Sequence, residues 1–148
     1  MNIEEVFLNG RMLDYDALKQ TSTLSLAYVG DAVFELLVRT SLNAEGMKTH
    51  GGMHGKAIRC VNAAAQARAI RLIEGEFTEE EAAVAKRGRN AAPHSKPKNM
   101  DTASYSSATS LETVFGWLWM SGRQNRAVSL FAKLWTRREE WAGGAEVK

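Results

Sequence analysis

The chain has 148 residues, of which 45% are hydrophobic and 24% charged, and its formal net charge is +2. This length suits one globular domain, and a nearly neutral chain gives no overall sign of nucleic-acid binding. A single cysteine excludes an internal disulfide and a Cys-rich zinc site. The sequence has no apolar run long enough to span a membrane and no signal-peptide pattern, so we expect a cytoplasmic protein.

The sequence predicts an all-α fold. It shows no sustained alternation of apolar and polar residues, and no Asn-Gly or Asp-Gly hairpin signal between β-branched runs. Helices are predicted over residues 14–20, 23–42, 54–74, 78–89, 105–121 and 123–141. We expect a single domain over residues 1–148, without repeats, in which residues 142–148 form a frayed tail.

The helix over residues 23–42 is predicted to be central and buried, because it is apolar on most sides. It follows three residues that can cap a first turn, Thr21, Ser22 and Thr23. Gly30 costs a helix about 1 kcal/mol relative to alanine, so another helix or a ligand is expected to approach there. Asp31 follows it, and a carboxylate among apolar residues is costly unless it is paired or binds a metal.

The next two predicted helices are marked by local signals at their ends. Gly75 is expected to end the helix over residues 54–74, in which Cys60 is read as a small buried residue. Thr78 and Glu81 have the spacing of a capping box at the start of the helix over residues 78–89.

Residues 84–100 are predicted to contain a basic loop. This segment has no acidic residue, both prolines of the chain lie in it, and His94 accompanies five cationic residues, Lys86, Arg87, Arg89, Lys96 and Lys98. Proline stiffens a loop and prevents helix continuation, and Asn90 and Asn99 add donors suited to phosphate. The alternative is an ordinary solvated surface loop.

The helix over residues 105–121 carries a second acidic residue in an apolar setting, Glu112. If this helix faces the helix over residues 23–42, Asp31 and Glu112 can bind one divalent cation; the alternative is a pair of buried acids neutralised by basic partners. Gly122 is expected to separate the last two helices. Their four tryptophans, Trp117, Trp119, Trp135 and Trp141, suit packing or a dimer seam better than base stacking.

These segments resemble the ribonuclease III catalytic domain, and in particular its compact bacterial branch, Mini-ribonuclease III. The resemblance lies in LAYVGDAVFELLVR, in HGKAIRCVNAAAQ, in TEEEAAVAKRGRNA and in PKNMDTASYSSATSLETVFGWLW. It spans nearly the whole chain, and the RGRNA, PKN and YSSATSLE stretches are more specific than GDAV alone.

The resemblance implies a symmetric, all-helical homodimer without a separate double-stranded-RNA-binding domain. Such an enzyme cleaves double-stranded RNA with Mg²⁺, for which Mn²⁺ can substitute, and leaves 5′-phosphate and 3′-hydroxyl ends. The implied substrate is precursor 23S ribosomal RNA, and a ribosomal protein is an expected partner. The catalytic, metal-binding acids fall on Asp31 and Glu112. Larger relatives have two further acids, at positions held here by Ala27 and Thr109, so a full two-metal site is not expected.

Further residues have expected roles with ordinary structural alternatives. Glu35, one turn after Asp31, is a candidate to hold a metal-bound water or else to pair with a nearby cation. Thr109 is a candidate to bind such a water or else to bond within its own helix. The expected RNA contacts are Lys86, Arg87, Arg89, Asn90, Lys96, Lys98, Asn99, His54 and Gln66. For His54, a surface histidine without a ligand is equally compatible.

Two other functions compete with duplex-RNA cleavage. A non-catalytic ribosome-assembly factor would use the basic segment to bind duplex RNA without cutting it. A helical metal-dependent hydrolase of small phosphorylated molecules would use the same carboxylates, but it would not need so long a basic segment.

Overall fold

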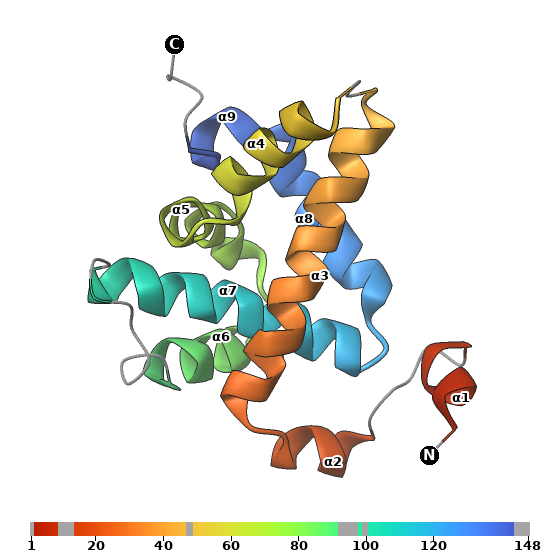
Figure 1. The fold of residues 1–148 in the computed structure, drawn as a ribbon. Helices are drawn as coiled ribbons and strands as arrows, with labels where there is room; N and C mark the ends of the chain where they lie inside the picture. Colours follow the sequence, from red (N-terminus) through yellow and green to blue (C-terminus); the bar gives the residue numbers. More distant parts are fainter. Residues whose placement is uncertain (1, 9–13, 47–48, 92–97, 99–100, 144–148) are drawn as a thin grey trace.

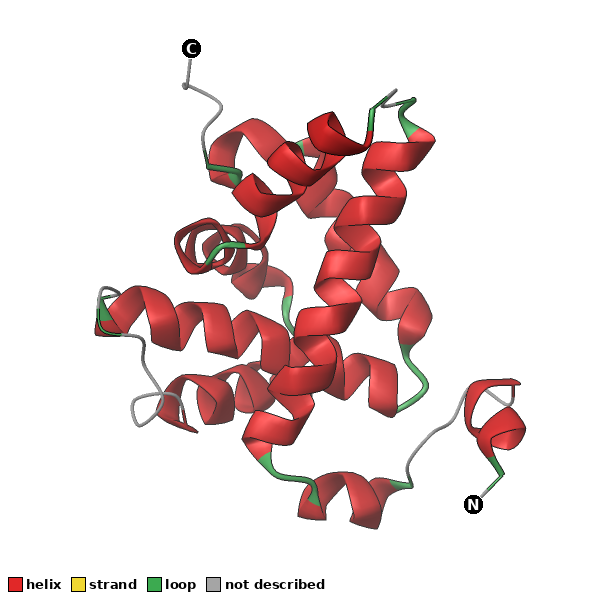
Figure 2. Cartoon of the chain, viewed as in Figure 1, coloured by secondary structure: helices red, strands yellow, loops and turns green. Residues whose placement is uncertain are grey.

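The structure is a computed structural model, and it describes residues 2–8, 14–46, 49–91, 98 and 101–143. Its helices are α1 (Ile3–Leu8), α2 (Tyr15–Gln20), α3 (Thr23–Ala44), α4 (His50–Val61), α5 (Ala63–Ile73), the 3₁₀ turn η1 (Glu74–Glu76), α6 (Glu79–Ala91), α7 (Thr102–Met120), α8 (Gln124–Thr136) and α9 (Arg138–Trp141). The described residues contain no strand, which confirms the all-α prediction (Figure 2). No helix among them has the length and hydropathy to cross a membrane.

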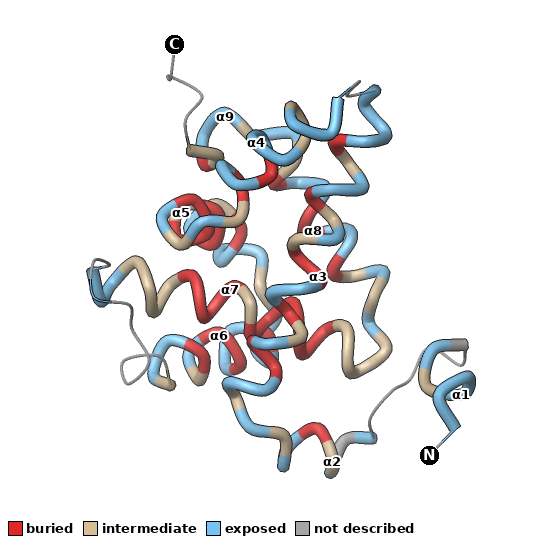
Figure 3. The backbone as a smooth tube through the Cα atoms, in the orientation of Figure 1, coloured by how far each residue is buried: buried red, intermediate tan, exposed pale blue. Residues whose placement is uncertain are grey.

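Helix α7 lies at the centre of the molecule. It crosses α3 and also packs against α5, α6 and α8 (Figure 1). Its middle is buried, whereas α3 has one buried side and one exposed side (Figure 3). The prediction of a central apolar helix therefore describes α7 better than α3.

Two glycines let α3 and α7 touch backbone to backbone. A Cβ placed on Gly30 would lie 1.6 Å from the main-chain oxygen of Glu112, and one on Gly116 would lie 1.8 Å from that of Leu26. No other residue type leaves room for contacts this close. Of the two expectations for Gly30, the approach of another helix is the one confirmed.

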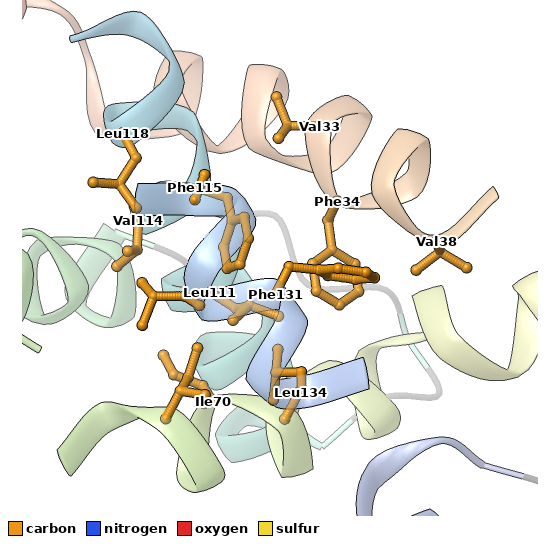
Figure 4. Close-up of a cluster of buried hydrophobic side chains, with 14 of the residues drawn as sticks. Val33, Phe34, Val38, Ile70, Leu111, Val114, Phe115, Leu118, Phe131 and Leu134 are labelled. Carbon is orange, nitrogen blue, oxygen red and sulfur yellow. The ribbon is translucent and has the colours of Figure 1, made fainter. Parts of the chain in front are cut away.

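Phe34 joins four helices in the core. Its ring makes edge-to-face contacts with Phe115 of α7, Phe131 of α8 and Trp141 of α9, at centroid separations of 5.5, 5.6 and 5.9 Å. Figure 4 shows Phe34, Phe115 and Phe131 within the surrounding aliphatic side chains. Such pairs add to the stabilisation that apolar burial provides.

Several predicted helix ends are confirmed. Ser22 caps α3 by accepting from Ser25 N at 3.0 Å. Thr78 and Glu81 form a reciprocal capping box: Glu81 N donates to Thr78 Oγ1 at 3.1 Å, and Thr78 N donates to Glu81 Oε1 at 2.9 Å. Gly122, with a φ of 78°, separates α7 from α8.

The predicted helix over residues 54–74 is wrong as a single element, because Asn62 divides it into α4 and α5. The Asn62 side chain donates to the carbonyls of Ile58 and Arg59, at 3.0 and 3.1 Å, and accepts from Ala65 N at 2.9 Å. One side chain thus satisfies the end of α4 and the start of α5.

The predicted helix over residues 123–141 is divided as well. Helix α8 ends at Thr136, and α9 turns so that Trp141 is fully buried and donates through Nε1 to Leu134 O at 2.7 Å. Trp117 is also buried, while Trp119 and Trp135 are half-buried against the core. The tryptophans therefore serve packing, as expected.

Cys60 is buried, as predicted, and burial raises the pKa of its thiol to about 11. A thiol with this pKa stays protonated at neutral pH and is a poor nucleophile. Cys60 is therefore part of the core.

Candidate active site

The crossing of α3 and α7 brings Asp31 and Glu112 together. Asp31 follows Gly30 on α3, and the Glu112 main chain is what Gly30 touches. The two carboxyl groups lie close enough for Asp31 to raise the pKa of Glu112. Asp31 is exposed and Glu112 half-buried, so the expectation of two buried carboxylates is wrong for Asp31. The reason is that Asp31 points to the exposed side of α3.

Burial raises the pKa of the Glu112 carboxyl, the nearby Asp31 carboxyl acts in the same direction, and together they bring this pKa to about 8. Among the described residues, neither Asp31 nor Glu112 has a salt-bridge partner. Within the part of the chain that the structure describes, no basic group therefore neutralises these two acids. A bound cation would stabilise two carboxyl groups that lie this close together.

The donor set of this site suits a hard cation. The described part of the chain has no group of three or more histidine, cysteine, aspartate or glutamate residues that could hold a metal. A structural zinc site, with its four protein ligands, does not fit. Mg²⁺ does fit, because it binds carboxylate oxygens and keeps several of its waters.

The raised pKa of Glu112 predicts how stability depends on pH. Ionising Glu112 in the folded chain is unfavourable, so its cost grows as pH rises from about 4.5 to about 8 and is full above that. We therefore compare the free energies of unfolding of Glu112→Gln and the natural chain without divalent cations. The advantage of Glu112→Gln should grow by about 2–3 kcal/mol as pH rises from 5 to 8.5. Urea unfolding at the two pH values measures this difference, and a difference that does not change with pH would contradict the prediction.

Gln66 lies beside Glu112 and is buried, with 2% of its surface exposed. We expected Gln66 to face RNA, and this expectation is wrong because the side of α5 that carries it packs inward. Its amide lowers the Glu112 pKa, yet Nε2 has no hydrogen bond of ordinary geometry.

Glu35 and Thr109 make the ordinary contacts that were the alternatives to a role in the site. Glu35 accepts a hydrogen bond and ion pair from Arg39 at 2.7 Å. Thr109 is buried and donates to the carbonyl of Tyr105, in its own helix, at 2.9 Å. Ala27, the other position where larger relatives have an acid, is buried too.

The first half of the predicted basic loop is helical, since α6 continues to Ala91. This correction has a physical reason in Gly88, which lets α6 approach α7: a Cβ there would lie 2.7 Å from Thr113 Oγ1. Ser110 Oγ also donates to Ala85 O at 2.7 Å, holding this part of α6 against α7.

The basic side chains of α6 differ in exposure. Lys86, Arg89 and Asn90 are exposed, whereas Arg87 is half-buried and donates to Thr23 Oγ1 at 3.4 Å. Beyond α6, Lys98 is exposed, and the predicted contacts Lys96 and Asn99 lie outside the described residues.

His54 is exposed on α4, and its ring stacks on that of His50 at a centroid distance of 6.2 Å. The structure therefore agrees with both readings of His54, a surface histidine and an RNA contact.

Gly116 and Gly88, which were not predicted from the sequence, also position the site. Both carry the signal that singled out Gly30, a glycine inside a helix where alanine would be more stable. Each carboxylate has such a glycine nearby on its own helix: Gly30 directly precedes Asp31, and Gly116 lies one turn after Glu112.

Comparison with known proteins places these residues in one family. Residues 24–123 match the Ribonuclease III domain. The chain is 40% identical over 103 residues to Mini-ribonuclease 3 of Symbiobacterium thermophilum, covering 70% of this chain and 79% of that protein. It is 40% identical over 121 residues to Mini-ribonuclease 3 of Enterococcus faecalis, covering 80% and 89%.

A similar fold occurs in a crystal structure of a protein from Fusobacterium nucleatum. The TM-score is 0.73 and the sequence identity 23%, and the match covers 82% of this chain and 97% of that one. At this identity the likeness concerns the fold alone.

Proposed function

This chain belongs to the ribonuclease III family and is an endoribonuclease of that family, and we propose that it cuts double-stranded RNA with Mg²⁺ to mature the ends of 23S ribosomal RNA. The observation that carries the proposal is the pair Asp31 and Glu112, which meet at a glycine crossing and have no salt-bridge partner among the described residues. The relatives named Mini-ribonuclease 3 support the duplex-RNA substrate.

Asp31 and Glu112 are the residues that hold the metal in this proposal. Ribonuclease III enzymes are generally metal-dependent, and a bound Mg²⁺ supplies Lewis-acid chemistry, making water more acidic and offsetting phosphate charge. The exposed Asp31 carboxylate is accessible to a phosphodiester from solvent. Glu112 is half-buried, so its ionised form depends on the cation for its stability. Hydrolysis leaves 5′-phosphate and 3′-hydroxyl ends.

The exposed end of α6 is the proposed contact to the RNA backbone. A-form RNA presents phosphates and 2′-hydroxyls across its shallow groove, and these accept hydrogen bonds from lysine, arginine and asparagine. Lys86, Arg89 and Asn90 supply such donors, and Gly88 keeps the helix that carries them packed against α7.

Neutralising two of these cations should weaken binding and reduce its salt dependence. We expect Lys86→Gln with Arg89→Gln to lower duplex-RNA affinity about tenfold at low salt and to reduce the slope of log K against log salt by about 1–2. Fluorescence anisotropy in Ca²⁺, with a labelled duplex over a range of KCl concentrations, measures both quantities.

Arg137→Gln is the matched control, because Arg137 is exposed, pairs with Glu140 and lies near α9, at the far end of the molecule from α6 (Figure 1). It should leave affinity and slope unchanged. Equal losses in the control and in the double variant would mean that α6 makes no particular contact with RNA.

The proposed homodimer uses the exposed side of α3. Three large apolar side chains lie there: Leu24 is 43% exposed, Tyr28 82% and Leu36 54%. The apolar middle of α7, which also suggested a dimer seam, is buried within one chain and is not available. A two-fold axis beside α3 would give each RNA strand one carboxylate pair.

Sedimentation at micromolar concentration should therefore give twice the 16.3 kDa mass of one chain. Tyr28→Glu should shift the protein to monomer, because a buried charge in an apolar interface is costly. A monomeric natural chain would overturn the dimer.

The substrate assignment is tested with a duplex RNA that carries the ends of precursor 23S ribosomal RNA. Cutting at the mature ends in Mg²⁺, and none in EDTA, supports the proposal. Duplex binding without cutting in Mg²⁺ or Mn²⁺ would favour a non-catalytic assembly factor. Competition by nucleotides, but not by duplex RNA, would favour a hydrolase of small phosphorylated molecules.

A further inference from the structure

Gln66 is buried beside the carboxylate pair with an unused hydrogen-bond donor. Only 2% of its surface is exposed, and its Nε2 is the one buried side-chain nitrogen or oxygen without a partner in the described part of the chain. Buried polar groups are nearly always paired, so an unpaired amide of this kind calls for a reason.

The Glu112 carboxyl is the acceptor that can account for the unpaired Gln66 donor. The Gln66 amide is close enough to Glu112 to act on that carboxyl as a hydrogen-bond donor, although Nε2 is not in ordinary hydrogen-bond geometry. An amide donor beside a carboxylate can hydrogen-bond one of its oxygens and so fix the direction of the other.

We propose that Gln66 is a positioning residue, whose amide donates to the Glu112 carboxylate and holds it in the orientation that binds a cation together with Asp31. This inference rests on the proposed metal site, and it assigns Gln66 to the carboxylate pair rather than to the RNA surface. Residues that hydrogen-bond metal ligands orient them and commonly contribute 10–100-fold to metal affinity.

A purely structural role explains the position less well. Ile70 on α5 and Leu111 on α7 belong to the apolar core, and methionine or leucine at position 66 would be buried without leaving a donor unpaired. Direct contact with RNA is also unsuited to a side chain with this little exposed surface.

The test measures Mn²⁺ binding to the RNA-free protein by calorimetry for the natural chain and for Gln66→Met, which has a similar shape and no donor. We expect Mn²⁺ affinity to fall about 10–100-fold in Gln66→Met, while metal-free thermal unfolding stays the same or improves. At subsaturating Mn²⁺, kcat on duplex RNA should fall, saturating Mn²⁺ should restore most of it, and KM for RNA should stay unchanged. Gln66→Leu repeats the test if Gln66→Met does not fold.

Gln124→Met is the matched control. Gln124 lies on α8 and donates through Nε2 to the carbonyl of Trp119 at 3.0 Å, away from the carboxylate pair. Its loss should lower stability slightly and leave Mn²⁺ affinity unchanged.

Unchanged Mn²⁺ affinity in Gln66→Met and Gln66→Leu would overturn the proposal, and a raised KM in that case would mark Gln66 as an RNA contact. The proposal would also be overturned if the natural chain binds no Mn²⁺. Because the metal measurement contains no RNA, its outcome is separate from whether the protein cuts precursor 23S ribosomal RNA.

Discussion

Asp31→Asn and Glu112→Gln should each reduce duplex-RNA cleavage by about 10³-fold or more, whereas folding persists. Each substitution keeps the size of the side chain and removes one of the two charges that we propose to hold the cation. Because the site has two carboxylates, either loss leaves a single ligand, which is insufficient to hold Mg²⁺ against water. A 10³-fold loss corresponds to about 4 kcal/mol of transition-state stabilisation.

The double variant should be little worse than either single variant, because the two side chains act as a unit. Single-turnover cleavage at saturating protein gives the rate, and circular dichroism gives the fold. Glu140→Gln removes an exposed carboxylate that pairs with Arg137 and should keep full activity. Activity within tenfold of the natural chain in either site variant would show that the pair is not the metal site.

The loss of activity can be separated from any loss of stability. Glu112→Gln removes a carboxyl whose pKa is raised to about 8, so at alkaline pH the variant should be inactive and yet more stable. Residues retained for catalysis at a cost in stability behave in this way. A residue that only supports the core would lose both together.

The sequence predicted those features that depend on neighbouring residues. The capping box of Thr78 and Glu81 and the cap at Ser22 need only a few residues, and both are present. The two carboxylates were also found from the sequence, although the burial argument that singled out Asp31 does not apply to it in the structure. The family pattern picked out the same residue by an independent route.

Features that depend on distant residues could not be read in advance. Asparagine is a common helix N-cap, but only the change of direction between α4 and α5 shows that Asn62 caps both helices. The end of α6 was predicted as a basic loop. It is helical because Gly88 packs it against α7, and this contact between distant residues is not visible in the local sequence. Gln66 likewise faces Glu112 only once α5 lies against α7.

Gly30→Ala should destabilise the fold by about 3–5 kcal/mol, or abolish folding, although alanine normally stabilises a helix. The added Cβ would lie 1.6 Å from the Glu112 carbonyl oxygen and 2.8 Å from Gly116 N, so α3 and α7 must separate. The obstacle is backbone, which cannot rotate away as a side chain can. Gly116→Ala meets the Leu26 carbonyl at 1.8 Å and should behave alike.

Gly55→Ala supplies the opposite expectation in the same chain. Gly55 lies inside α4, and a Cβ there meets nothing within 4 Å, so the variant should gain about 0.5–1 kcal/mol. Urea unfolding of the three variants measures these differences. Equal effects in Gly30→Ala and Gly55→Ala would mean that the two helices do not touch at Gly30. Asp31 would then have no fixed position opposite Glu112, because the crossing is what brings the two carboxylates together.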